Sequence, residues 1–524
     1  MTFELADVPR LMPEILLTLW GSTILLLDVF TRWRSGPEGL RERSYEAATM
    51  ALMGLAVIFA LVFIQGGYLI NLPERVPEDA NPLTRAVIGA LINLRAGGAE
   101  GTVLGNAFIV DPLTHLARLT FIGAAIITVM LTINYRPSRS PGEFYSLLLF
   151  STVGMSFMAA SGDLILIYLA IELTSIPLYI LSGYFINDRR STEAGMKYFL
   201  FGALSSAILL YGMSLAFGMT GSTSLDDIAA GMRQGSPLLI IAMIFVIAGM
   251  GYKVAVFPFH AWAPDVYQGA PTTITAFIST ASKMAGFLVL LRVLSTGFAP
   301  LAGTARLAAG FGGWASILAI IAFFTIIFGN LGALPQTNAK RLLAYSSIAH
   351  AGFLLLGMLG VSTLSTPAML YYLVVYTLTN LGAFGALAII AAHVGGDEIS
   401  DLNGLGWRSP LLAMLMTVMV LSLAGVPPLS GFFAKFYIFM AAWEQGAYWL
   451  VVAGVLMTIV SLYYYLRLLK AMYIEPRPTE TSLEIPRWSK LALSVSTLLV
   501  VVLGIYPSLI LGVLENVATR IAAR

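Results

Sequence analysis

The sequence contains no cysteine and only four histidines among its 524 residues. Without cysteine, the chain cannot form a disulfide, a thiolate zinc site or an ordinary iron–sulfur cluster. The histidines are widely spaced, which argues against a haem or metal centre. The sequence also has no GxGxxG fingerprint and no P-loop, so we expect this chain to bind no nucleotide. The net charge of +2 says little about partners, and we expect no nucleic acid among them.

Charged residues are also scarce. They make up 11% of the chain, whereas a soluble domain carries about 25%. Apolar residues make up 58%, and the mean hydropathy is +0.83. This composition predicts an all-α polytopic protein of the cell membrane, with nearly all of the chain inside the bilayer.

Apolar segments of spanning length recur along the whole chain. We count fourteen of them, at 11–31, 48–70, 109–135, 143–160, 163–186, 193–219, 237–260, 271–297, 311–333, 340–361, 367–393, 410–440, 446–472 and 490–515. Loops after odd-numbered segments hold fifteen lysines and arginines, and the opposite side holds eight. The positive-inside rule therefore places both termini on the non-cytoplasmic side.

Two stretches outside the spans have helical character. Residues 84–95 lie in a long outer loop at 71–108, and residues 224–234 follow the sixth span. We expect both to form short helices along the membrane surface.

The distribution of lysine is the strongest functional signal. The chain has 7 lysines and 23 arginines, and four of the lysines lie inside apolar segments: Lys197, Lys253, Lys283 and Lys435. Arginine keeps its proton permanently, whereas a buried lysine can release one near neutral pH. Ionisable residues inside a membrane are rare and costly, so their repetition indicates proton exchange within the bilayer.

Prolines interrupt two of the spans. Pro258 breaks the seventh span a few residues after Lys253. The twelfth span would be roughly 46 Å long as a straight helix, too long for one crossing, and Pro427 and Pro428 break it before Lys435. Two broken helices in the two halves of a membrane protein favour an inverted-repeat fold with ion sites at the breaks.

A carboxylate lies in apolar surroundings near the middle of the fifth span. We predict that this residue, Glu172, faces Lys253. At about 4 Å and an effective dielectric near 20, the attraction would be roughly 4 kcal/mol. Moving the carboxylate away would then help Lys253 to release its proton. The alternative is a static ion pair that locks two helices together.

Lys283 and Lys435 extend this line, and we predict proton transfer at both rather than static anchoring. Hydroxyls at Ser279, Thr280 and Ser282 would hold water beside Lys283, or else only join helices.

Three further residues are candidate relays. Lys197 has Glu193 as its i−4 partner, and the alternative is that its side chain only reaches to the interface. His260 lies at the first break, where it would relay between Lys253 and Lys283 or cap the broken helix. His350 would bridge toward Lys435.

Three long motifs resemble signatures of subunit N of respiratory NADH–quinone oxidoreductase (complex I), the mitochondrial subunit 2 type. These are HAWAPDVYQGAPTTITAFISTASKMAGF at 260–287, QTNAKRLLAYSSIAHAGF at 336–353 and LSLAGVPPLSGFFAKFYIF at 421–439. PEILLTLWGSTILLLDVF at 13–30 resembles the N-terminus of the same subunit. The resemblance covers nearly the whole chain, and only the loop at 71–108 is longer than expected for the family.

The resemblance implies fourteen helices, with helices 4–8 and 9–13 as inverted five-helix repeats and helices 7 and 12 broken. It divides the chain into an N-terminal three-helix extension at 1–142, repeats at 143–300 and 301–475, and a C-terminal helix at 476–524. It implies an antiporter-like subunit that pumps protons through Glu172, Lys253, Lys283 and Lys435. The sister subunit M usually carries glutamate at the last position, so Lys435 favours subunit N.

The resemblance also implies that enzymatic activity belongs to the assembled complex. The chain itself would bind no cofactor, and FMN, iron–sulfur clusters and quinone would lie in other subunits. Membrane subunits M, K and J and surrounding lipids would be its partners. A ferredoxin-driven or photosynthetic relative of complex I would contain the same subunit.

Two other functions fit the same residues. One is a subunit of a multisubunit sodium/proton antiporter that has no redox partner. The other is a scaffold that does not pump, in which the buried charges only hold helices together.

Overall fold

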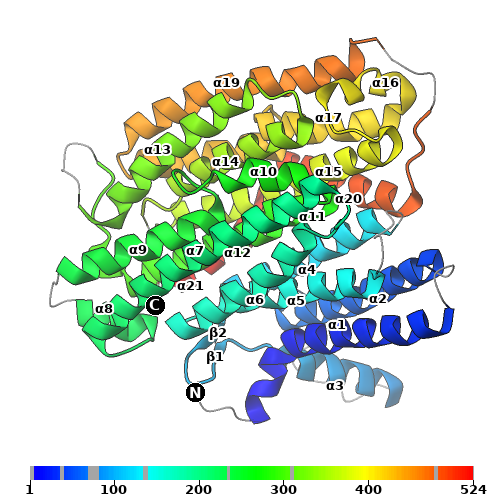
Figure 1. Ribbon diagram of the computed structural model, residues 1–524. Coiled ribbons are helices and arrows are strands. Elements are labelled where there is room, and N and C mark those ends of the chain that lie inside the picture. The colour runs from blue at the N-terminus through cyan, green and yellow to red at the C-terminus, as the bar shows by residue number, and fades with distance from the viewer. Residues whose placement is uncertain are drawn as a thin grey trace.

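A computed structural model describes residues 5–35, 40–68, 82–133, 140–232, 237–306, 312–360, 362–476 and 482–522. These residues form a helical bundle with one small hairpin (Figure 1). The helices of the first half are α1 Val8–Ser35, α2 Leu40–Gln65, α3 Pro82–Gly97, α4 Pro112–Thr132, α5 Pro141–Ala160, α6 Leu164–Ser182, α7 Arg189–Thr220, α8 Leu225–Met232, α9 Pro237–Val254, α10 Trp262–Gly269, α11 Thr272–Phe277 and α12 Lys283–Arg292. Those of the second half are α13 Gly313–Ala333, α14 Ala339–Leu356, α15 Ser365–Val394, α16 Leu405–Arg408, α17 Pro410–Ala424, α18 Ser430–Glu444, α19 Tyr448–Tyr473, α20 Arg487–Ile505 and α21 Ser508–Ala522.

Twelve helices among the described residues are long and apolar enough to cross a membrane. Two predicted spans fall outside this set. The segment at 340–361 forms α14, and the segment at 410–440 forms the two shorter helices α17 and α18. The membrane character of the fold is confirmed, and the count of fourteen crossings stays a prediction.

Both predicted helix breaks are confirmed. Helix α9 ends at Val254 and α10 begins at Trp262, while α17 ends at Ala424 and α18 begins at Ser430. Gly425 ends α17 in the left-handed region with φ of +86°, where glycine meets no steric penalty. The breaks leave helix ends, with their free carbonyl groups, inside the bundle.

The last predicted span, 490–515, is wrong as a single helix. Tyr506 leaves the helical conformation with φ of −125° and ψ of 71°, and Pro507 separates α20 from α21. The residue before a proline is pushed out of the α region, which explains the break. Helix α21 buries Leu514 and Val517, and its main helix contact is with α15.

One end of the bundle carries several short elements. Helix α8 and the antiparallel hairpin of β1 (Gly101–Val103) and β2 (Phe108–Val110) lie at the same end as both chain termini (Figure 1). Helix α16 lies at the opposite end. Helices α3 and α8 confirm the two predicted short helices, and the remainder of the loop at 71–108 includes residues 71–81, which lie outside the described part.

The helical run Thr272–Gly297 forms the centre of the bundle. Its most apolar stretch is entirely buried within the chain, as is most of that of α15. The run contains a π-helical turn at Ile278–Ser282, directly before Lys283. A π turn adds a residue to the helix and is frequent at functional sites, because it changes where the following side chains point.

A buried ion pair fastens the N-terminal helix to the bundle. The guanidinium of Arg118 on α4 lies 2.8 Å from the carboxylate of Glu14 on α1, and Ser156 on α5 also donates a hydrogen bond to Glu14. Side-chain exposure is 1% for Arg118 and 2% for Glu14. Each charge therefore depends on the other for its solvation.

Replacing Arg118 by methionine should destabilise the protein by about 3–5 kcal/mol, because Glu14 remains buried without a cation. The thermal midpoint of the purified complex measures the loss. The double variant R118M/E14Q should recover much of the stability. Equal loss in the single and double variants would show that packing, rather than charge, holds α1.

Candidate functional site

Three lysines lie in the interior of the bundle on three different helices. The exposed fractions of Lys253 on α9, Lys283 on α12 and Lys435 on α18 are 6%, 2% and 4%. A buried ammonium needs hydrogen-bond acceptors in place of water. The acceptors differ at each lysine.

Lys253 is bound to a hydroxyl. Its Nζ donates to Ser175 Oγ on α6 at 2.9 Å. Glu172 lies one turn before Ser175 on the same helix, is half-buried, and accepts a hydrogen bond from Ser206 on α7. Within the described structure Glu172 and Lys253 form no ion pair, so the predicted direct contact is corrected. Ser175 occupies the place next to the ammonium, and Glu172 attracts Lys253 from farther away.

Lys283 is bound to a single residue of α14. Its Nζ lies 2.5 Å from Ser347 Oγ and 2.8 Å from the Ser347 carbonyl oxygen. It also lies 5.9 Å from the centre of the Tyr376 ring. The predicted neighbours Ser279 and Thr280 instead donate to the carbonyl of Ala276 on their own helix.

A chain of hydrogen bonds leads away from Lys283. Asn380 Nδ2 donates to Tyr376 Oη at 2.6 Å, and Tyr376 Oη donates to Ser347 Oγ at 2.7 Å. Both donors lie on α15, one turn apart. Because Asn380 can only donate here, Tyr376 must use its own proton on Ser347. Ser347 then has its remaining lone pair for Lys283.

His350 is the centre of a second polar group on α14. Its Nδ1 lies 2.7 Å from Tyr372 Oη, and its Nε2 lies 3.2 Å from Tyr465 Oη. Tyr465 is in turn hydrogen-bonded to Ser346, the residue before Ser347. Among the described residues His350 makes no hydrogen bond to a lysine, although the charges of Lys283 and Lys435 both act on its ring.

Lys435 binds the end of a helix. Its Nζ donates to the carbonyl oxygens of Leu423 and Ala424 at 2.9 and 3.0 Å. These are the last two residues of α17, where carbonyls have no helical partner and the helix dipole is negative. Its Nζ also lies 5.3 Å from the centre of the Phe353 ring. The break in the twelfth predicted span thus supplies the acceptors for its own lysine.

Lys197 belongs to an ionic cluster at one end of the bundle. The predicted pair with Glu193 is confirmed at 2.8 Å, and a second ion pair joins Lys197 to Asp265 at 2.5 Å. Arg341 on α14 binds the other carboxylate oxygen of Asp265 at 2.6 Å. Asp265 on α10 therefore connects α7 with α14. Lys197 itself is 35% exposed and is not in the buried line.

Among the described residues, His260 makes no hydrogen bond to Lys253 or Lys283, the two lysines that it was predicted to connect. Its nearest rings are Phe257 at 5.8 Å and Phe328 at 6.3 Å between centroids. Its Nδ1 has no hydrogen-bond partner among the described residues. A relay role for His260 stays a prediction that no hydrogen bond supports.

Tyrosines and an asparagine form the part of the site that sequence reasoning missed. Tyr372, Tyr376 and Asn380 are spaced four residues apart and so lie on one face of α15. Polar groups at this spacing within an apolar segment are visible in the sequence and predict a polar face on a buried helix. The described residues contain no group of three or more His, Asp or Glu side chains that could hold a metal ion.

Comparisons with known proteins show the family of the chain. The family model described as NADH:quinone oxidoreductase/Mrp antiporter, TM, matches residues 161–461. NADH-quinone oxidoreductase subunit N 2 of Herpetosiphon aurantiacus is 53% identical to the chain, and subunit N 1 of Roseiflexus castenholzii is 50% identical. Both alignments cover 100% of each protein.

Solved structures show the same fold. A chain of respiratory complex I from Thermus thermophilus has a TM-score of 0.74 and 31% identity, and the match covers 96% of this chain and 99% of that one. A chain of the Mrp complex from Dietzia sp. has a TM-score of 0.76 at 20% identity, covering 97% of each chain. Because the identity to the Mrp chain is only 20%, this second match shows a shared fold and nothing more.

Replacing Gly425 by alanine should weaken proton transfer through Lys435. An added Cβ would lie 3.0 Å from Lys435 Cδ and would press on the lysine. The left-handed φ adds a penalty of roughly 1–2 kcal/mol. Proton pumping per turnover, measured in proteoliposomes, should fall.

Gly395→Ala is the matched control, since Gly395 has φ of +80° and nothing within 4 Å of an added Cβ. It should lose similar stability without the pumping defect. Equal defects in both variants would attribute the effect to backbone strain.

Proposed function

The chain belongs to the subunit N family of NADH-quinone oxidoreductases, and we propose that Glu172, Lys253, Lys283 and Lys435 carry its proton-transfer function. As a member of this family it is an antiporter-like, proton-translocating membrane subunit of the enzyme. The redox cofactors and the quinone chemistry reside in other subunits of the complex.

The observation that carries the proposal is the set of acceptors around each buried lysine. Lys253, Lys283 and Lys435 are bound to hydroxyl and carbonyl oxygens, and none of the three has a carboxylate within ion-pair distance in the described structure. A static charge would be stabilised best by a fixed counter-ion. Neutral acceptors instead accommodate both the ammonium and the amine, as proton exchange requires.

The proposed sequence of events begins at Glu172. Quinone reduction in a neighbouring subunit changes the field at this half-buried carboxylate, and its attraction on Lys253 changes with it. Lys253 exchanges its proton with Lys283, on the adjacent helix α12. His350 and the tyrosines around it lead toward Lys435, which releases the proton on the opposite side.

The energies are compatible with this scheme. Moving one charge against about 100 mV requires about 2.3 kcal/mol. A unit charge at about 6 Å in an effective dielectric near 20 contributes roughly 3 kcal/mol, which is comparable to this requirement.

The remaining features of the family fold are part of the same proposal. The fourth to eighth predicted spans, within 143–300, would form one inverted repeat, and the ninth to thirteenth, within 301–475, would form the other. The extension at 1–142 would precede them, and the C-terminal part at 476–524 would follow. The excess of basic residues in loops after odd-numbered spans supports a non-cytoplasmic position for both termini.

Co-purification tests the assignment to a redox enzyme. A tagged chain extracted in mild detergent should bring down NADH–quinone reductase activity. Recovery of only antiporter-like subunits would favour the sodium/proton antiporter, for which the Mrp-like fold is the supporting observation.

Replacing Lys253 by alanine should abolish proton pumping while the complex still assembles, because the proton carrier is lost but the fold is not. Proton uptake by proteoliposomes, divided by the rate of NADH oxidation, measures this. Lys490→Ala is the control, since Lys490 is exposed at the start of α20. Loss of the assembled complex in K253A alone would support a structural role for the lysine.

Tyr376 should act as a positioning residue for Lys283. Tyr376→Phe keeps the ring beside Lys283 but removes the hydroxyl that donates to Ser347. The hydroxyl of Ser347 is then no longer held by Tyr376, so its hydrogen bond with Lys283 changes. The pH profile of pumping should therefore shift. Tyr437→Phe, in a half-buried tyrosine on α18, is the comparison. An unchanged pH profile in Y376F would remove Tyr376 from the mechanism.

A further inference from the structure

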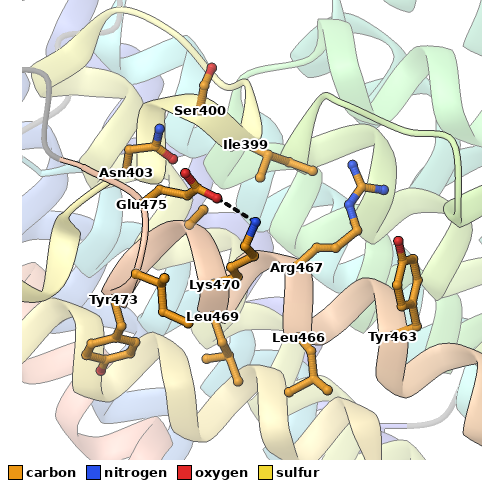
Figure 2. A pocket seen from close by; sticks show the side chains of 12 residues that line it. Ile399, Ser400, Asn403, Tyr463, Leu466, Arg467, Leu469, Lys470, Tyr473 and Glu475 are labelled. Carbon is orange, nitrogen blue, oxygen red and sulfur yellow. Dashed lines mark ion pairs between the residues drawn. The ribbon is translucent and has the colours of Figure 1, made fainter.

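A groove lies at the end of α19, on the same side of the bundle as α16. Its volume is about 800 Å³. The walls are the last turns of α19 and the segment that contains Ile399, Ser400 and Asn403. Arg467 and Lys470 extend from α19 toward that segment, and Leu466 and Leu469 point the other way (Figure 2). The proton-transfer residues do not line it.

An exposed apolar stripe leads along α19 into the groove. Val452, Leu456, Ile459 and Tyr463 are 57%, 55%, 64% and 62% exposed. Their spacing of three and four residues places them on one face of the helix. Lys470 follows seven residues after Tyr463, so it continues the same face. The stripe therefore ends in a cation.

The length of α19 is consistent with Lys470 lying at the level of lipid headgroups. Lys470 is 22 residues after Tyr448, the first residue of α19, which corresponds to roughly 33 Å of helix. The hydrocarbon core is about 30 Å thick, so one end of α19 reaches each boundary. A tyrosine and a lysine near a helix end are typical anchors at this level.

The groove carries a positive charge. Lys470 pairs with Glu475 at 2.7 Å, which balances one cation. Arg467 donates to the carbonyl oxygens of Leu334 and Gln336 at 2.5 and 3.1 Å. It has no carboxylate within ion-pair distance in the described structure. One unbalanced guanidinium thus faces a groove that is otherwise lined largely by apolar and tyrosine side chains.

We propose that this groove binds the headgroup of an anionic phospholipid, with the acyl chains along the apolar stripe of α19. The phosphate would lie between Arg467 and Lys470 and would compete with Glu475 for the lysine. A phospholipid fits because its charge, its chain length and its depth match the cations, the stripe and the position of Lys470. The inference does not depend on which residues carry protons.

Native mass spectrometry of the purified complex tests the proposal. The complex is stripped of lipid by detergent exchange and titrated with phosphatidylglycerol or phosphatidylcholine. Phosphatidylglycerol should be retained preferentially. Lys470→Gln should weaken retention roughly fivefold, as expected for one interfacial cation, and Glu475→Gln should strengthen it by removing the competing carboxylate.

The control is Lys490→Gln, which removes a lysine at the start of α20, outside the groove. Equal retention in K470Q and K490Q would overturn the proposal, as would equal retention of both lipids by the unmodified complex. Displacement by millimolar inorganic phosphate would assign the site to free anions instead. Cross-linking of Ile474→Cys to another subunit in membranes would show that protein covers the groove, and would also overturn it.

Discussion

The structure depends on one constraint: an ammonium group inside a membrane protein must find oxygen acceptors that water would otherwise supply. Lys253 donates to a hydroxyl, and Lys283 donates to both the hydroxyl and the carbonyl oxygen of Ser347. Lys435 donates to the carbonyl oxygens at a helix end. The broken helix near Lys435 follows from this need, because an intact helix would leave no free carbonyl at that depth.

The three environments differ in how readily they change. Ser347 offers a hydroxyl, which can both accept and donate, whereas the carbonyls at the end of α17 can only accept. Lys253 donates to Ser175, whereas the more exposed Glu172 on the same helix accepts from Ser206. The carboxylate can therefore change its position without breaking a direct bond to the lysine. The three proposed proton-transfer lysines thus have three different sets of acceptors.

Much of this could be read from the sequence, because the signals are local. Prolines mark the two breaks, and lysines in apolar runs mark the buried charges. The partners of those charges could not be read, because they come from other helices: Ser347, Tyr376 and Tyr465 approach the line only through packing. The expected Glu172–Lys253 contact failed for the same reason. The division of the last predicted span at Pro507 was a local signal that the hydropathy of the segment concealed.

The bonds from Lys435 to Leu423 and Ala424 have a mechanical consequence. Binding energies between two sites are reciprocal, so a proton that tightens the ammonium onto the last turn of α17 is itself held more firmly when that turn is in place. Any displacement of α17 must then alter the occupancy of the lysine, and each change of occupancy must pull on α17. The break in the helix thereby couples movement of α17 to the protonation of Lys435.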